Sequence, residues 1–198
     1  MRVISITGWK GGVQKTVTSV HLATFLSDKG LVVLVDGDAN RSALSWAERG
    51  KFSYEVVDQR AAMKSIVGAD YVVIDSPARP ESEDLKEMAK GSDLLILPVI
   101  PDVLSLEPTL KMSQELQGAQ YRFLIAMSHP PPNRDGELYR QELADSGIPV
   151  FRSIVRRSIT VPQAALQGVT VRDLKNERAQ AVWSDFAALG KEVLEVLA

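Results

Sequence analysis

The sequence of 198 residues contains no cysteine, which excludes disulfide bonds, thiolate metal sites and iron–sulfur clusters held by cysteine. It also lacks an apolar stretch long enough to cross a bilayer, and its first residues do not have the layout of a secretory signal. We therefore expect a cytoplasmic protein. The formal net charge is only −2, so any contact with nucleic acid must come from a local basic patch.

The composition is that of an ordinary globular protein, with 45% hydrophobic and 24% charged residues. The length suits one domain, 1–198, and no linker or repeat divides it. Short apolar runs alternate with helical patterns along the chain. Strands are expected at 2–7, 31–36, 54–57, 70–75, 93–100, 122–127 and 149–154. Helices are expected at 16–29, 41–50, 81–90, 103–117, 137–146, 161–167 and 178–197. The alternation predicts an α/β fold with a mostly parallel, twisted sheet flanked by helices on both faces.

A glycine-rich turn joins the first expected strand to the first expected helix. Residues 8–16 read Gly-Trp-Lys-Gly-Gly-Val-Gln-Lys-Thr. In this context, the backbone N–H groups of the turn and the helix dipole converge on a phosphate group. Lys15 is placed to reach the β- and γ-phosphates of a nucleotide, and the Thr16 hydroxyl to ligate Mg²⁺. The alternative is a tight strand-to-helix turn without a ligand.

Two other apolar strands deliver carboxylates to their C-terminal ends. The run 31–36 ends in Asp36 and is followed by Asp38, and the run 70–75 ends in Asp75. Ligands bind at this edge of open α/β sheets, and an aspartate there often holds Mg²⁺ in enzymes with a phosphate loop. An aspartate at a strand end is also a common helix cap or turn residue. The order of the loop and the two carboxylates favours the nucleotide site.

Lys10-Gly11-Gly12-Val13-Gln14-Lys15-Thr16 resembles the loop K-G-G-x-G-K-T of the ParA/MinD family of deviant Walker A ATPases. The segment 36–40, Asp-Gly-Asp-Ala-Asn, is similar to the family's D-x-D-P-Q, with departures at its last two positions. The resemblance covers nearly the whole chain. It is strongest to the short partition ATPases that lack an N-terminal helix-turn-helix, and it implies a single-domain P-loop NTPase.

The resemblance implies a role for each matched position. Lys10 is the signature lysine, which would cross a nucleotide-sandwich homodimer to the partner's ATP. Asp38 would position the attacking water, and Asp75 would be linked to Mg²⁺. The implied catalytic residues are Lys10, Lys15 and Asp38; the nucleotide contacts are Lys10, Gly11, Gly12, Val13, Gln14, Lys15, Thr16 and Val17; and the metal site is Thr16, Asp38 and Asp75. The implied cofactors are ATP/ADP and Mg²⁺.

The loop departs from the family at two positions. Gln14 stands where the pattern has glycine, and its side chain is expected to crowd the diphosphate. We interpret it as a substitution, engineered or natural, that weakens nucleotide binding or closure of the sandwich. Val17 replaces the family's usual second threonine, so one hydroxyl contact to phosphate is lost while its N–H remains.

The segment 152–178 contains six basic residues and two acidic ones in a chain of negative net charge. Phosphate contacts from such a patch give salt-sensitive binding to DNA of any sequence. The other interpretation is a solvated face with local ion pairs, but the family resemblance favours nonspecific DNA binding. The candidate contacts are Arg152, Arg156 and Arg157.

The expected function is a dimerising Mg²⁺-ATPase that cycles on and off the nucleoid and positions a cargo. An adaptor of ParB type would stimulate its ATP hydrolysis. The cargo stays open between a plasmid, a chromosome region, a protein cluster and a protein-shelled organelle. The alternatives are a MinD-like membrane-cycling ATPase, a metabolic P-loop ligase and a nucleotide-free scaffold. Residues 187–198 contain one lysine against two glutamates, which disfavours a membrane-binding tail and any stable membrane insertion.

Overall fold

The computed structural model describes residues 1–78 and 80–198, and the side chains of all of these except residues 78 and 103–106. The strands are β1 (Arg2–Gly8), β2 (Val32–Asp36), β3 (Glu55–Asp58), β4 (Tyr71–Ala78), β5 (Leu94–Val99), β6 (Tyr121–Ser128) and β7 (Val150–Arg156). The helices are α1 (Lys15–Leu26), α2 (Ser42–Glu48), α3 (Ala62–Ser65), α4 (Ser82–Gly91), α5 (Val103–Glu115), α6 (Asp135–Asp145), α7 (Thr160–Leu166) and α8 (Glu177–Leu197), with a short 3₁₀ helix η1 (Val171–Asp173) before α8. Every expected strand and helix is present.

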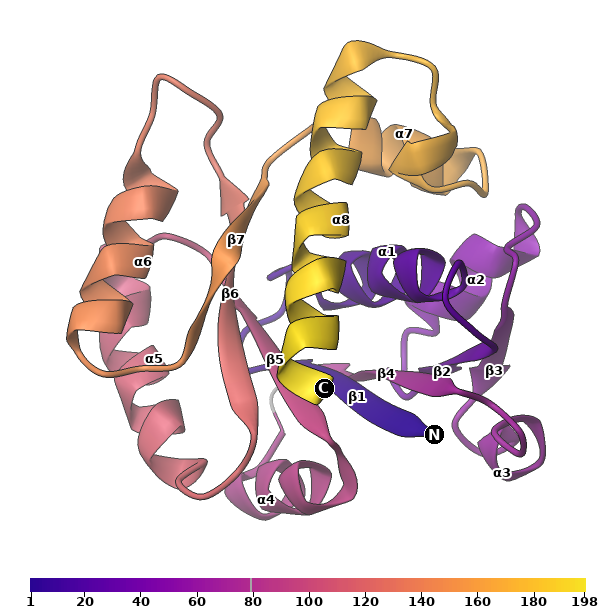
Figure 1. The fold of residues 1–198 in the computed structure, drawn as a ribbon, viewed down its shortest axis with the longest axis horizontal. Coiled ribbons are helices and arrows are strands. Elements are labelled where there is room, and N and C mark those ends of the chain that lie inside the picture. The colour runs from indigo at the N-terminus through magenta and orange to yellow at the C-terminus, as the bar shows by residue number, and fades with distance from the viewer. Residues whose placement is uncertain (79) are drawn as a thin grey trace.

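The strands form one seven-stranded sheet in the order β3-β2-β4-β1-β5-β6-β7, and each observed pairing is parallel. Parallel pairing requires crossover connections, and the helices that supply them lie on both faces of the sheet (Figure 1). The predicted fold class is therefore confirmed. The connection from β1 to β2 runs through α1, and the glycine-rich loop lies between β1 and α1 at the C-terminal edge of the sheet.

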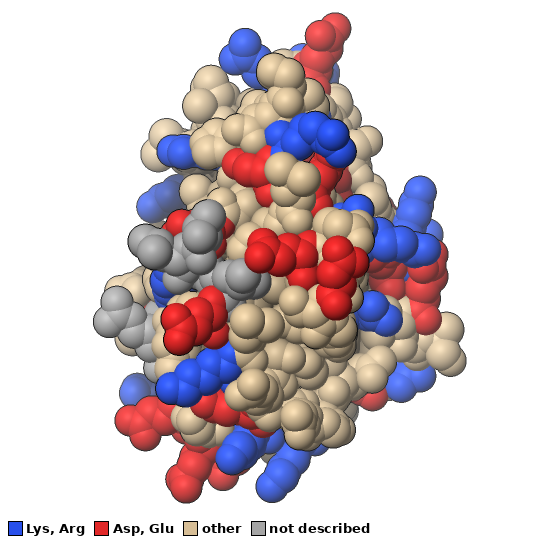
Figure 2. Space-filling view, turned by 90° about the vertical axis from the view of Figure 1, so that its left-hand side faces the viewer, with Lys and Arg blue, Asp and Glu red and all other residues tan. Residues whose placement is uncertain are grey.

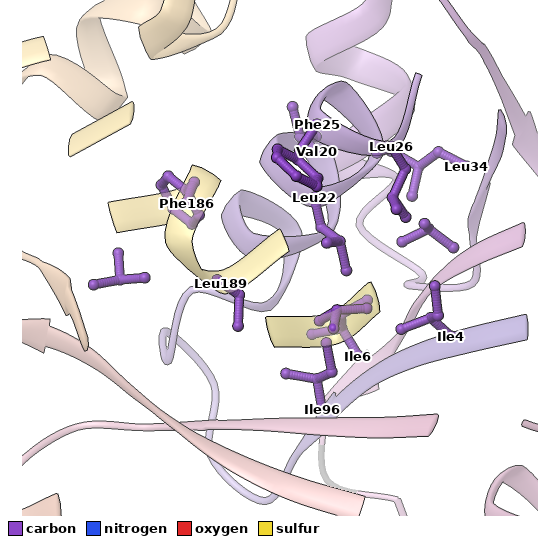
Figure 3. Packing of buried hydrophobic residues seen from close by; sticks show 14 of the residues in the cluster. Ile4, Ile6, Val20, Leu22, Phe25, Leu26, Leu34, Ile96, Phe186 and Leu189 are labelled. Carbon is purple, nitrogen blue, oxygen red and sulfur yellow. The ribbon is translucent and has the colours of Figure 1, made fainter. Parts of the chain in front are cut away.

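Successive residues of each strand face opposite sides of the sheet, and helices cover both sides. The strand sequences are therefore almost continuously apolar. On one side, α1, α2, α7 and α8 enclose the largest apolar cluster. On the other side, α4, α5 and α6 cover β5 and β6, and α3 covers β2 to β4. Figure 3 shows Phe186 and Leu189 of α8 packed near Val20 and Leu22 of α1. The helix that follows the glycine-rich loop is thus fixed on a rigid core. Within the described residues, no helix is long and apolar enough to cross a membrane.

His21 connects α1 to the segment before α8. Its ring is fully buried and stacked on Phe186, with 4.3 Å between the ring centroids. The Val171 N–H donates to Nε2 at 3.2 Å, so Nε2 is the acceptor and Nδ1 carries the proton that it donates to the Val17 carbonyl at 2.7 Å. Burial lowers the pKa of His21 to about 4, against the opposing effects of the Val17 hydrogen bond and the Asp173 charge. The ring is therefore neutral at pH 7.

We expect the contribution of His21 to the free energy of unfolding to fall as the pH is lowered from 6.5 towards 4. The raised pKa of Asp75, about 7, acts in the opposite direction over the same interval, so the His21 contribution is measured as the difference between the native protein and a His21 variant. Because the pKa of His21 is about 6.5 in the unfolded chain and about 4 in the native one, the unfolded state binds more protons across this interval. The contribution of His21 to the free energy of unfolding is fully present above pH 6.5, and about 3 kcal/mol of it is lost by pH 4. Urea unfolding at several pH values measures it. A His21→Gln variant, whatever its absolute stability, should lose this part of the slope, and an unchanged slope would contradict the assignment.

Candidate functional site

The turn between β1 and α1 has the conformation of an anion-binding loop. Gly12 and Gln14 have positive φ angles of 77° and 67°, so the backbone curls before α1 begins at Lys15. Within the described residues, the N–H groups of residues 11–17 have no acceptor, whereas the N–H of Thr18 donates to the Gln14 carbonyl. This row of unpaired donors at the start of a helix is the arrangement that binds phosphate.

Gln14 adopts a left-handed conformation that glycine takes without strain and glutamine takes at a cost of about 1–2 kcal/mol. The glycine of the family pattern thus serves a backbone conformation as well as close approach to the ligand. The Gln14 side chain is half-buried, and its Oε1 is buried without a hydrogen-bond partner. The structure therefore gives a second physical reason why Gln14 disfavours this loop.

Lys15 and Thr16 occupy the first turn of α1, where their side chains border the unpaired N–H groups. Lys15 is buried, with 7% of its surface exposed, and Thr16 is half-buried. Asp75 lies on the adjacent strand β4, in register with Ile6 of β1 and Asp36 of β2. The site thus combines groups from three neighbouring strand ends, as the sequence predicts.

Asp75 is fully buried, and its Oδ1 accepts a hydrogen bond from Ser19 Oγ at 3.2 Å. Burial raises the pKa of Asp75 to about 7; the Asp36 charge adds to this, while the Thr16 and Ser19 hydroxyls and Lys15 oppose it. Its Oδ2 has no hydrogen-bond partner within the described residues. An unpartnered carboxylate oxygen beside the Thr16 hydroxyl fits hydrated Mg²⁺, which prefers oxygen ligands and retains several waters.

Asp36 organises the loop that presents Asp38. Its two carboxylate oxygens accept from the N–H groups of Asp38, at 3.1 Å, and Leu44, at 3.0 Å. The buried Asp36 therefore fixes both the Asp38 loop and the first turn of α2. The sequence alone shows only that Asp36 ends a strand, and a ligand-binding carboxylate would occupy the same position. Asp38 Oδ1 accepts from the Asn40 N–H at 2.9 Å. Within the described residues, its Oδ2 forms no hydrogen bond, so this oxygen is available for a water.

Lys15, Thr16 and Asp38 line one open cleft of about 1050 Å³, together with groups from α2, α7 and the end of β6. The lining residues are Gly11, Gly12, Gln14, Lys15, Thr16, Val17, Asp38, Asn40, Ser42, Trp46, Arg49, Met127 and Ala165. In the described chain, the non-glycine residues with positive φ are Gln14, Arg41 and Met127; two of them line the cleft and Arg41 lies between two lining residues. Strained backbone gathers at functional sites, which supports this cleft as the site.

Lys10 and Val13 line a second, mostly apolar cavity of about 550 Å³ on the other side of the loop. This cavity is bordered by Trp9, by the end of β5 and by α5. Trp9 is 42% exposed, and Lys10 is also exposed at the tip of the loop. The two lysines of the loop therefore border different cavities. Lys15 belongs to the cleft described above, and the proposed roles of Lys10 and Val13 in nucleotide binding stay predictions.

The three arginines predicted to bind DNA differ in their surroundings. Arg156 donates twice to Asp185 of α8, at 2.6 Å and 2.7 Å. Arg152 lies 3.4 Å from Glu192 and also pairs with Glu195. Arg157 is exposed, its N–H donates to the Ser128 carbonyl at 2.8 Å, and it forms no ion pair within the described residues. DNA binding stays a prediction, and its most available cation is Arg157.

Comparison with known proteins gives relatives along the whole chain. Maintenance of carboxysome distribution protein A of Gloeobacter kilaueensis is 29% identical, over 97% of this chain and 94% of that protein. Among solved structures, an ATP complex of a variant of Cyanothece McdA has a TM-score of 0.73 at 18% identity, covering 98% of this chain and 96% of that one. The MinD cell division protein of Aquifex aeolicus also has a TM-score of 0.73 at 18% identity, with 98% and 97% covered. At these identities the two structures support the fold alone.

The domain family described as the CobQ/CobB/MinD/ParA nucleotide binding domain matches residues 4–171, which span the loop and both aspartate motifs. The resemblance to ParA and MinD is therefore confirmed, and the expectation of an ATPase is confirmed at the level of the family. With the phosphate-binding geometry and this match over most of its length, the chain belongs to the CobQ/CobB/MinD/ParA family of nucleotide-binding domains.

Proposed function

We propose that this protein is a dimerising, Mg²⁺-dependent ATPase that positions a cargo by cycling on and off DNA. The observation that carries the proposal is the row of unpaired N–H groups at residues 11–17, which borders a cleft containing Lys15, Thr16 and Asp38. Phosphoryl transfer to water requires neutralised charge and an oriented water rather than a covalent nucleophile. The groups in this cleft match those requirements.

The proposed roles follow from the surroundings of each residue. The N–H groups and the buried Lys15 ammonium bind the phosphates and offset their negative charge. Thr16 and, through water, Asp75 would hold Mg²⁺, which supplies further neutralisation of the phosphate oxygens when bound. Asp38 accepts a hydrogen bond from the attacking water through the oxygen that Asn40 leaves unused. Asp36 holds Asp38 in place without contacting the substrate.

Lys10 supports a role for a second subunit. It borders the cavity beside Trp9 rather than the cleft that contains Lys15. In our proposal, the two copies pair through this face and each Lys10 reaches the phosphates bound by the partner. Hydrolysis then depends on dimerisation, in the same way that an arginine supplied in trans controls other phosphoryl-transfer enzymes.

The cargo that we propose is a protein-shelled organelle, and a small adaptor would connect the ATPase to it. The relative that is 29% identical over nearly the full length carries the name of a carboxysome distribution protein. The MinD-like alternative finds less support. A membrane-binding helix needs a free apolar face, whereas the apolar face of α8 is buried in the core through residues such as Val182, Phe186 and Leu189.

DNA binding in this proposal depends on the C-terminal edge of β7. On the face shown in Figure 2, basic and acidic side chains are interspersed, and no continuous basic surface is visible outside the grey atoms. Arg157 is exposed and has no acidic partner within the described residues, so its guanidinium can contact a phosphate without breaking an ion pair. Arg152 and Arg156 must first break their ion pairs with carboxylates of α8 before they can contact a phosphate.

Light scattering after size exclusion, combined with ATP turnover with and without duplex DNA, tests the proposal. We expect a monomer without nucleotide, a dimer with MgATP, and retention of only the dimer on duplex DNA. A chain that binds no nucleotide would contradict the proposal entirely. A chain that binds nucleotide but neither binds DNA nor dimerises would instead support the ligase alternative.

Arg157→Gln is expected to weaken duplex binding by about threefold or more at low salt, because one unpaired cation is lost from the surface. The matched variant Arg152→Gln removes the same charge from a side chain that two glutamates already neutralise, and a smaller effect is expected. Filter binding at several salt concentrations measures both variants, with AMPPNP affinity as the control. Equal DNA affinity of the Arg157 variant and the native protein would remove this residue from the proposed surface.

A further inference from the structure

Arg49 places an additional cation at the mouth of the phosphate cleft. It follows the last residue of α2 and lines the cleft together with Lys15, Thr16 and Asp38. Its guanidinium donates to Ser45 Oγ at 3.2 Å and to the Ala165 carbonyl of α7 at 3.5 Å. The second distance is at the limit of a hydrogen bond, so the guanidinium can turn into the cleft with little loss.

The backbone at Arg49 is fixed by a close contact between two segments. A Cβ atom at Gly50 would overlap the Gly168 carbonyl, and one at Gly168 would overlap the backbone of Arg49. Gly168 also has a φ of 67°, which favours glycine. Beside this contact, Trp46 Nε1 donates to the Val169 carbonyl at 2.9 Å. The end of α2 is therefore held against the turn after α7, which gives Arg49 a defined position.

Among the residues that the structure describes, no carboxylate balances the charge of Arg49. Several other arginines of the described chain form ion pairs, among them Arg41 with Asp58, Arg156 with Asp185 and Arg172 with Asp28, although Arg157 does not. Within the described residues, Arg49 has no carboxylate within ion-pair distance; its partners are a hydroxyl and a carbonyl. An arginine with neutral partners in a cleft that already contains Lys15 and unpaired N–H groups is suited to an anionic ligand.

We propose that Arg49 contacts the terminal phosphate of the bound nucleotide and so contributes to the preference for a triphosphate over a diphosphate. The inference rests on the proposed function, because it assumes that the cleft binds a nucleotide. Thr16 and Asp38 mark the side of the cleft on which the terminal phosphate and the attacking water would lie. Arg49 lines this same cleft, and its planar guanidinium can donate two parallel hydrogen bonds to one phosphate.

A purely structural role is the competing explanation. Arg49 donates to a carbonyl in the last turn of α7, where a cation also favours the helix dipole. An Arg49→Gln variant separates the two roles, because its amide retains N–H donors but has no charge. Arg41→Gln is the matched control: it lies at the other end of α2, and its guanidinium is already engaged by Asp58.

Isothermal titration with MgAMPPNP and with MgADP tests the inference in the native protein and both variants. We expect Arg49→Gln to weaken AMPPNP binding by about tenfold and ADP binding by less than about twofold. Arg41→Gln should change neither affinity by more than about twofold. The same variants in a Gln14→Gly background repeat the measurement with a tighter loop. Thermal unfolding without nucleotide checks that each variant is folded.

The outcomes distinguish the inference from the proposed function. If the native protein and the Gln14→Gly variant bind neither nucleotide, the proposed function fails and the inference fails with it. If they bind normally and Arg49→Gln has the native preference for AMPPNP over ADP, the inference alone is overturned. An equal loss of both affinities together with a lower melting temperature would assign Arg49 to the cap of α7 and would also overturn it. A loss of duplex DNA binding with unchanged nucleotide affinities would overturn it in favour of a DNA contact.

Discussion

Replacing Asp38 by asparagine is expected to lower ATP turnover by about 100- to 1000-fold while MgAMPPNP binding changes by less than about twofold. Asparagine retains the side-chain oxygen that accepts from the Asn40 N–H, so the loop held by Asp36 keeps its shape. The lost group is the carboxylate oxygen that has no hydrogen bond within the described residues and that we assign to the attacking water. The substitution should therefore slow ATP hydrolysis without changing the affinity for the nucleotide.

Single-turnover hydrolysis and equilibrium binding measure these two quantities separately. Asp58→Asn is the matched control, since Asp58 lies in register with Asp36 on the neighbouring strand and its carboxylate is engaged by Arg41. That variant should hydrolyse ATP at the native rate. Should Asp38→Asn turn over ATP as fast as the native chain, the water would have another positioning residue.

Replacing Gln14 by glycine is expected to tighten nucleotide binding by about tenfold or more and to stabilise the ligand-free protein by about 1–3 kcal/mol. Two costs are removed, which are the left-handed conformation of a residue with a Cβ and the buried Oε1 without a partner. The larger backbone entropy of glycine in the unfolded chain offsets about 0.5–1 kcal/mol of the gain. Affinity increases further because the amide no longer crowds the diphosphate.

A Gln14→Ala variant divides these contributions, because alanine removes the amide but keeps the Cβ that disfavours positive φ. Titration with MgADP and urea unfolding of the three proteins give the comparison. An affinity gain shared by alanine and glycine would assign the effect to the side chain, and a gain confined to glycine would assign it to the backbone. Equal affinity and stability in all three proteins would show that Gln14 does not impair the loop.

The sequence predicts the fold well because the sheet is parallel and covered on both faces. Its strands are continuous apolar runs, and each observed strand begins and ends within three residues of its predicted bounds. The elements without a prediction are α3 and η1, which have four and three residues and are too short to give a periodic pattern.

The candidate site is predictable where a motif fixes the backbone. The loop, Asp38 and Asp75 all follow strands, and the register of β1, β2 and β4 brings these strand ends together. The left-handed conformation of Gln14 also agrees with the pattern, because glycine, which the pattern has at this position, adopts that conformation without strain. The structural role of Asp36 is not predictable, because a carboxylate that binds two N–H groups and one that binds Mg²⁺ look the same in the sequence.

Contacts between distant segments could not be predicted. The acidic partners of Arg152 and Arg156 lie on α8, 29 to 43 residues further along the chain, so counting charges within 152–178 overestimates the free positive charge. Arg49 depends on the contact between Gly50 and Gly168, which a single sequence does not reveal. The only hint of this contact in the sequence is that Gly50 and Gly168 each follow a helix.

A crystal structure of the native protein with AMPPNP and Mn²⁺, which replaces Mg²⁺ and can be located by its anomalous scattering, is the most direct test of the phosphate-binding loop. We expect the phosphates to accept hydrogen bonds from the N–H groups of residues 11–16, with Mn²⁺ beside the Thr16 hydroxyl and facing Asp75. Phosphates bound elsewhere, for example in the cavity beside Trp9, or loop N–H groups that turn away from the nucleotide, would contradict the account.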